Sequence, residues 1–202
     1  MGQEAGALEV TDLLGELARL KKSLASLRGK RDFIVIDTAP RLGFELTTAL
    51  FAADWYLIPV FASRYDTDGL GRLTQTVTKI RQRVNRHLQL LGVLLGNFDA
   101  RTNLHAQILE SLRGKVGEKT FETVIKHAVK HDEATHHRQT IFERAPGHNS
   151  ANQFDELAKE VIDRVLASQS AAEAERVVSM PRRAVPNGDA QPRPAVGEVT
   201  GG

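Results

Sequence analysis

The sequence predicts an α/β protein with a parallel β-sheet and helices on both of its faces. Four short apolar runs recur along the chain: Phe33–Asp37, which is rich in β-branched residues, Trp55–Phe61, Leu88–Asn97 and Thr120–Ile125. Strands buried on both faces of a parallel sheet have this composition. Segments with helical spacing separate the runs, as in βαβ units. Asp37 ends the first run, at the edge where open α/β sheets bind ligands.

Five segments have apolar residues at helical spacing: Leu13–Leu27, Leu42–Ala53, Leu70–His87, Leu104–Arg113 and Asn152–Leu166. Val129–Gln139 is polar, and we expect a loop there that can include one helical turn. The apolar periodicity stops near Ser168, and four of the seven prolines lie in Pro181–Pro194. We therefore expect one domain over residues 1–168 and a disordered tail over residues 169–202.

The composition excludes several classes of protein. The chain of 202 residues has no cysteine, which rules out disulfides and Cys-ligated zinc. A net charge of only +2 does not fit a strongly basic nucleic-acid coat but leaves room for a local basic patch. We find neither a signal peptide nor an apolar stretch long enough to cross a bilayer, so we expect a cytoplasmic protein.

A phosphate-binding loop of the form G-x-x-x-x-G-K-[ST] occurs nowhere in the sequence. The stretch "RGKVGEKT" has similar letters, but Glu118 separates Gly117 from Lys119. It also follows a predicted helix and enters a predicted strand, which is the reverse of a phosphate loop. We interpret it as a helix end with a turn.

Six motifs in order resemble the ParA/Soj family of partition ATPases, which belongs to the deviant Walker-A group with MinD. They are "VIDTAPRLG", "LIPV", "DGL", "LLGVLLGNFDARTNL", "GEKTFETVIKHAVKHDEA" and "ANQFDELAKEV". The resemblance covers about residues 11–168. It implies part of a P-loop NTPase-like fold, a parallel sheet with flanking helices, followed by the tail.

The resemblance also implies a nucleotide site, with ATP and Mg²⁺ as cofactors. Asp37 would be the acid at the Mg²⁺ and water position, and Pro40 and Gly43 would shape the loop after it. Asn97 would contact the adenine. No separate metal site is expected, although five of the seven histidines lie between His127 and His148.

The implied partners are non-specific DNA, a ParA-type dimer partner and a ParB-like centromere-binding protein, and the implied location is the nucleoid. Arg101 and Lys130 fall where partition ATPases carry basic residues for DNA. We expect no membrane contact, because the polar face of the last helix mixes acidic and basic residues.

The sequence also departs from the family pattern. Ala39 and Arg41 stand where family members usually have proline and serine, and "IKHAVKHDEATHHR" lacks a proline and an asparagine of the family's adenine loop. The family's N-terminal part with the phosphate loop is absent, and we expect it to be encoded upstream or lost. The chain alone should then be inactive as an ATPase. Two alternatives to a ParA-like partition protein stay open, an inactive module that pairs or competes with a full-length ParA- or MinD-like ATPase, and a truncated gene product.

Overall fold

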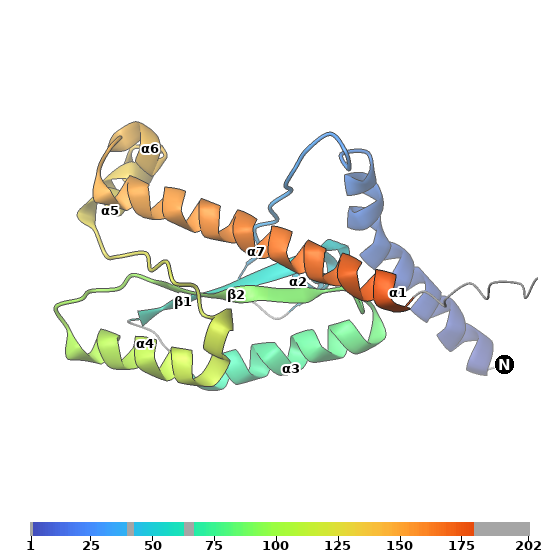
Figure 1. Ribbon diagram of the computed structural model, residues 1–202. Coiled ribbons are helices and arrows are strands. Elements are labelled where there is room, and N and C mark those ends of the chain that lie inside the picture. The colour runs from blue at the N-terminus through green and yellow to red at the C-terminus, as the bar shows by residue number, and fades with distance from the viewer. Residues whose placement is uncertain (1, 40–42, 63–66, 180–202) are drawn as a thin grey trace, which may run out of the picture. The chain divides into compact units, whose positions relative to one another are not determined.

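The computed structural model describes residues 2–39, 43–62 and 67–179. By its internal contacts the chain forms two units, Met1–Leu166 and Ala167–Gly202. The centre of the first unit is a parallel pair of strands, β1 (Trp55–Phe61) and β2 (Gln89–Gly96), with a register shift after Tyr56 (Figure 1). The predicted α/β fold with a parallel sheet is therefore confirmed.

A third extended segment follows the other edge of β2 without forming a regular strand. Its Phe121 N–H donates to Val93 O at 2.9 Å, and its Ile125 N–H donates to Leu95 O at 3.0 Å. Gly92 permits this approach, because a Cβ at that position would lie 2.5 Å from the Phe121 ring. The predicted strand at Thr120–Ile125 thus lies where expected, but it forms an isolated bridge with β2, between Thr120 and Val93, in place of a strand ladder.

The prediction of a strand at Phe33–Asp37 is wrong. Residues 33–39 have no regular secondary structure, and Val35 is 91% exposed. β-branched residues favour an extended backbone, but a strand also needs a neighbour that pairs with its N–H and C=O groups. In the ranges that the structure describes, β1 pairs with β2 alone, and no strand pairs with residues 33–39.

Helices cover both faces of the sheet within the first unit (Figure 1). Leu112 of α4 (Asn103–Val116) packs with Val93 and Leu95 on one face, where Leu73 of α3 (Thr67–Arg83) also contacts the cluster. The apolar stripe of α7 (Asn149–Ser179) packs against β2 and Phe121 on the other face, as predicted for the last helix. α1 (Gly2–Ala25) contacts α2 (Phe44–Ala52), and Leu50 of α2 packs with Val77 and Ile80 of α3.

The remaining elements correct two further expectations. The predicted polar loop at Val129–Gln139 is largely a helix, α5 (Val129–His136). A short helix α6 (Ile141–Arg144) follows, started by a capping box between Thr140 and Glu143, while η2 (Gly117–Lys119) is the turn predicted in the "RGKVGEKT" stretch. α7 continues to Ser179, so residues 169–179 of the expected tail are helical; residues 180–202 lie outside the described ranges. Ala, Glu and Arg in this stretch are good helix formers.

Candidate functional site

The loops that follow β2 and the 120–126 segment meet at one edge of the sheet. The Phe98 N–H donates to Ile125 O at 3.1 Å, and the His127 N–H donates to Phe98 O at 2.9 Å. These two bonds join the loop after β2 to the chain that enters α5. The predicted adenine residue Asn97 and the predicted DNA residues Arg101 and Lys130 all lie on these two loops or at the start of α5.

Asn97 directly follows β2 in a left-handed backbone conformation, with φ of 51°. Asparagine tolerates this conformation better than most residues with a side chain. Its Oδ1 lies 2.8 Å from Nδ1 of His127, so the two loops are also joined through side chains. The amide that the sequence assigns to a base is therefore already engaged within the protein.

Arg101 is exposed but paired with an acid of its own loop. Its guanidinium donates to both carboxylate oxygens of Asp99, with Nε at 2.9 Å from Oδ1 and Nη2 at 2.7 Å from Oδ2. These bonds from Arg101 hold the pKa of the Asp99 carboxyl well below its usual range. They also raise the pKa of Arg101, so both groups are charged at neutral pH.

Lys130 has an acidic neighbour as well. Its Nζ lies 3.0 and 2.8 Å from the two carboxylate oxygens of Glu133, one turn further along α5. Arg144 approaches the same carboxylate at 3.6 Å. The hydrogen bond from Lys130 is the main cause that lowers the pKa of Glu133. An anion that binds Lys130 must therefore compete with Glu133.

Asp37 and Gly43, two further predicted nucleotide residues, lie on other segments of the chain. Asp37 is exposed on the irregular 33–39 segment, and Gly43 precedes α2 as its N-cap with an extended backbone. Pro40 lies outside the described residues. A nucleotide phosphate requires a cradle of backbone N–H groups and a lysine, and the sequence lacks that motif. The residues present do not fit ATP and Mg²⁺ by themselves, so no chemical step through nucleotide is derived.

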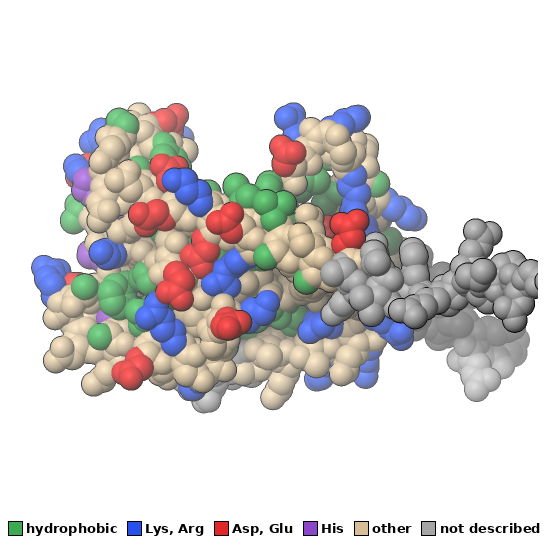
Figure 2. Space-filling model, in the orientation of Figure 1, with side chains coloured by type: hydrophobic (Ala, Val, Ile, Leu, Met, Phe, Trp, Pro, Cys, Tyr) green, Lys and Arg blue, Asp and Glu red, His purple; other side chains and the backbone are tan. Residues whose placement is uncertain are grey.

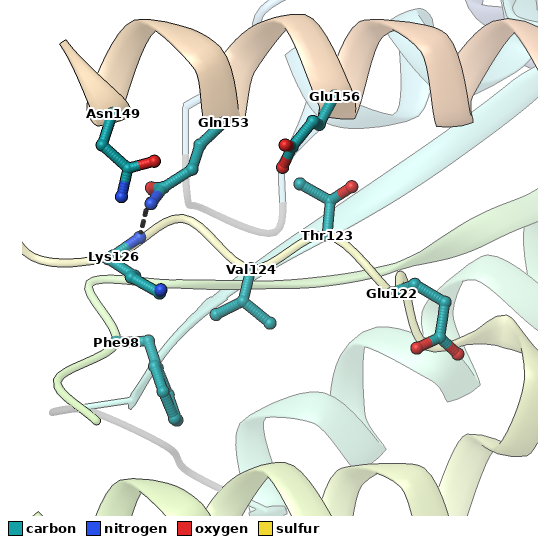
Figure 3. A pocket seen from close by; sticks show the side chains of 8 residues that line it. All are labelled: Phe98, Glu122, Thr123, Val124, Lys126, Asn149, Gln153 and Glu156. Carbon is teal, nitrogen blue, oxygen red and sulfur yellow. Dashed lines mark hydrogen bonds between the residues drawn. The ribbon is translucent and has the colours of Figure 1, made fainter. Parts of the chain in front are cut away.

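A hollow of about 390 Å³ lies beside the predicted site, between the 122–126 segment and α7 (Figure 3). Gln153 of α7 points into it and accepts the Lys126 N–H at 2.9 Å. Further along α7, Glu160 accepts the N–H groups of Glu122 and Thr123, each at 2.9 Å. These side chains occupy backbone donors that an edge strand would otherwise expose. We therefore assign this face of α7 to the closure of the sheet edge.

Two features of the described ranges bear on other functions. Within residues 2–39, 43–62 and 67–179 there is no group of three or more His, Asp or Glu side chains that could hold a metal. Over the same residues, every helix is too short or too polar to cross a membrane.

The sequence reasoning missed one group of charged residues, at the C-terminal end of α3. Lys79, Arg83 and Arg86 are exposed there. A charge count along the chain would have found them, because no acidic residue occurs from Gly69 to Phe98.

Comparisons with known proteins define the class and then the family. The fold is similar to that of cobyrinic acid a,c-diamide synthase from Mycobacterium smegmatis, in a crystal structure with bound ADP and magnesium. The TM-score is 0.53 at 28% identity, over 57% of this chain and 47% of that chain. The parallel sheet, its flanking helices and this likeness define a P-loop NTPase-like α/β protein.

Within this class, the comparisons support the ParA/Soj family for this chain. Residues 5–90 match an AAA domain family. The chain is 37% identical over 160 residues to the sporulation initiation inhibitor protein Soj of Bacillus subtilis, which is 79% of this chain and 63% of that protein. It is 35% identical over 159 residues to the chromosome-partitioning ATPase Soj of Thermus thermophilus, which is 76% of this chain and 64% of that protein. The chain thus spans less than two thirds of the length of these relatives.

Proposed function

We propose that this chain is a ParA-like partition protein, which contributes to chromosome or plasmid segregation by contacting DNA and by pairing with a ParA-type partner. The observation that carries the proposal is the similarity to the Soj proteins, which extends over more than three quarters of the chain. The relatives from Thermus and from Myxococcus xanthus are named for chromosome partitioning.

The DNA contact rests on Arg101 and Lys130. Both side chains reach solvent, with 85% and 42% of their surface exposed, and both belong to the same loop edge. Each forms an ion pair with an acid near the surface, and solvent and salt weaken such pairs. A DNA phosphate could replace Asp99 or Glu133 as the partner, and the resulting contact would have no sequence preference.

The test is the affinity of the full chain for short fluorescent duplexes of two unrelated sequences, measured by anisotropy over a range of salt. We expect equal, weak binding to both duplexes that declines as salt rises. Arg101→Ala and Lys130→Ala should weaken both equally, whereas Asp99→Asn should strengthen binding because it releases Arg101. A double Arg101→Ala/Lys130→Ala variant that binds like the wild type would remove both residues from the DNA site.

Nucleotide binding would require an assembly of this chain with another polypeptide. ATP with Mg²⁺ would bind only when another polypeptide segment supplies a phosphate loop, with Asp37, Pro40 and Gly43 on the Mg²⁺ side and Asn97 toward the base. A ParB-like protein would then act on that assembly, at the nucleoid. Addition of a full-length ParA ATPase tests this, because complex formation should depend on Mg·ATP.

A second candidate is an inactive module that pairs with or competes with a full-length ParA- or MinD-like ATPase. Two features favour it: among the residues described, no strand lies on the outer side of β1, and the side chains of Phe33, Ile34 and Val35 are exposed. Such a module should lower the ATPase rate of its full-length partner when added in excess. A rate that rises instead would favour the first candidate.

A further inference from the structure

The end of α3 and the turn after it carry four basic side chains, Lys79, Arg81, Arg83 and Arg86, which we call the α3 cation surface. All four are exposed. The run from Gly69 to Phe98 contains no Asp or Glu, although the chain has 25 acidic residues. Figure 2 shows Lys and Arg side chains gathered at the lower right, where the C-terminal end of α3 lies in Figure 1. The segment that forms this surface is therefore cationic and contains no acid of its own.

Packing of α3 fixes which way these side chains face. Val77 and Ile80 are 1% and 6% exposed and point into the core, where they meet Leu88. The helical repeat then leaves Lys79 and Arg83 on the solvent side, four residues apart. Like charges at this spacing disfavour the helix. The helix dipole favours cations only in the last turn, so it does not account for Lys79.

These cations differ from Arg101 and Lys130, each of which has an acidic partner. Lys79, Arg83 and Arg86 form no ion pair with any residue in the described ranges. Asp54 lies at the same end of the strands, since its carbonyl accepts the Gln89 N–H, but its carboxylate is paired with Arg28 at 3.6 Å. An anion would not have to displace a carboxylate from these three side chains.

The same surface contains a hollow of about 510 Å³, lined by Thr78, Arg81, Gln82 and Arg86. All four side chains carry hydrogen-bond donors, and two are guanidinium groups. Guanidinium groups pair with phosphate oxygens in bidentate geometry. None of these four side chains is aliphatic or aromatic, the types that anchor protein partners. Its chemistry favours a phosphodiester over an acidic peptide.

We propose that the α3 cation surface binds the phosphate backbone of duplex DNA without sequence preference. The inference rests on the proposed DNA contact and gives that contact a surface of its own, away from the loops of Arg101 and Lys130. Binding at unpaired cations releases counterions from DNA without breaking protein ion pairs. The α3 cation surface should therefore contribute more to affinity than the two paired residues.

The experiment compares two triple variants of the full chain on the same fluorescent duplexes. One carries Lys79→Gln, Arg83→Gln and Arg86→Gln; Arg81 is left in place because its charge acts on the partly buried Tyr56. The control carries Lys22→Gln, Lys119→Gln and Lys159→Gln, which removes the same charge from exposed positions elsewhere. Circular dichroism checks that both variants fold like the wild type.

We expect the α3 variant to bind DNA roughly tenfold more weakly and to lose about 2–3 units of the slope of log affinity against log salt, while the control changes little. Equal losses in the two variants would overturn the inference, since net charge alone would explain them. Wild-type binding by the α3 variant, with loss on Arg101→Ala and Lys130→Ala, would overturn the inference but keep the proposed function. A wild-type chain that binds poly-glutamate and not DNA would overturn both.

Discussion

Asn85 is a buried polar residue, 6% exposed, that holds the C-terminal end of α2. Its Nδ2 donates to Leu50 O at 2.9 Å and to Ala53 O at 2.8 Å, and it lies 3.2 Å from Phe51 O. The last carbonyls of a helix have no partner within the helix. One side chain from the turn after α3 thus satisfies the end of α2 and ties α2 to the start of β2.

At this residue we predict a large loss of stability on substitution. Asn85→Ala leaves these carbonyls without their donor in a buried place, which costs about 1–3 kcal/mol. Asn85→Asp should cost more, because a carboxylate would face the carbonyl oxygens. Urea unfolding gives the free energies, and Asn152→Ala, at an exposed position, serves as the control. If Asn85→Ala lowers the free energy of unfolding no more than the control does, this role of Asn85 is contradicted.

A second residue-scale prediction concerns Gly92. A methyl group there would meet the Phe121 ring at 2.5 Å and Lys119 O at 2.7 Å, and the second of these is backbone that cannot move aside by a rotamer change. Gly92→Ala should therefore push the 119–121 segment away from β2 and destabilise the protein by about 1–3 kcal/mol. Gly114→Ala is the matched control, since a Cβ there would have no neighbouring atom within 4 Å. Thermal unfolding of both variants measures the difference.

At the scale of elements, α7 is fixed to the sheet by Glu160 and Arg164. Arg164 donates to Glu160 at 2.8 Å and to the carbonyls of Glu118 and Thr120 at 3.0 and 2.7 Å. Its guanidinium also lies 4.3 Å from the centre of the Phe121 ring. Glu160 in turn caps backbone donors of the 122–123 segment. The pair thus joins a helix to a segment that lacks a regular strand ladder.

This pair should make the stability of the protein depend on pH. Burial acts to raise the pKa of Glu160, but the N–H groups of Thr123 and Glu122 and the side chain of Arg164 outweigh it and lower the pKa below the ordinary 4.5. A lowered pKa in the folded state means that the carboxylate stabilises the fold above about pH 4.5 and loses this effect as the pH falls.

We therefore expect Glu160→Gln to destabilise the protein at neutral pH by about 1–3 kcal/mol, as for a hydrogen bond to a charged group. The difference in unfolding free energy between the wild type and the variant should shrink as the pH is lowered from 5 toward 3. This range includes the ordinary pKa of 4.5. Denaturant unfolding at several pH values measures it. Glu156→Gln, at an exposed position on the same helix, should show no such trend. A constant difference across the series would show that Glu160 does not titrate in this range.

At the scale of the whole molecule, the two edges of the sheet are unequal. Side chains of α7 cap the edge beyond β2, whereas β1 has no strand on its outer side among the residues described, and Val35 is 91% exposed. Exposed apolar chain beside an open strand edge promotes association. We predict that the isolated chain self-associates or needs a partner strand, and that Val35→Lys reduces association more than Leu104→Lys. A monodisperse wild-type monomer that unfolds sharply above about 65 °C would contradict this.

The whole chain should also lack ATPase activity. Stabilisation of the phosphates depends on loop amides and a lysine that this sequence does not contain. We expect no hydrolysis above background in a coupled assay and only weak binding of Mg·ATP by calorimetry. Micromolar affinity for Mg·ATP would show that another part of the chain holds the phosphates.

The class of fold, the family and the main elements could be predicted from the amino-acid sequence. The apolar run Trp55–Phe61 is β1 residue for residue, and the predicted run Leu88–Asn97 contains β2. The helices α3, α4 and α7 also lie where apolar periodicity placed them. The loop motif from Asn97 to Arg101 follows β2 as expected. Such features depend on residues within one short segment, so local composition and the spacing of apolar residues are sufficient to predict them.

Only the tertiary structure shows which backbone groups are hydrogen-bonded and which charged side chains form ion pairs. Phe33–Asp37 has the composition of a strand but pairs with none, because pairing depends on a neighbour that its own residues do not specify. The bonds of Asn85 to Leu50 and of Glu160 to Glu122 join residues 35 and 38 positions apart. Asp99 forms an ion pair with Arg101, whereas Lys79, Arg83 and Arg86 form no ion pair with a residue in the ranges described. These outcomes depend on contacts between segments that are distant in the sequence. The residues within any one short segment do not specify such contacts.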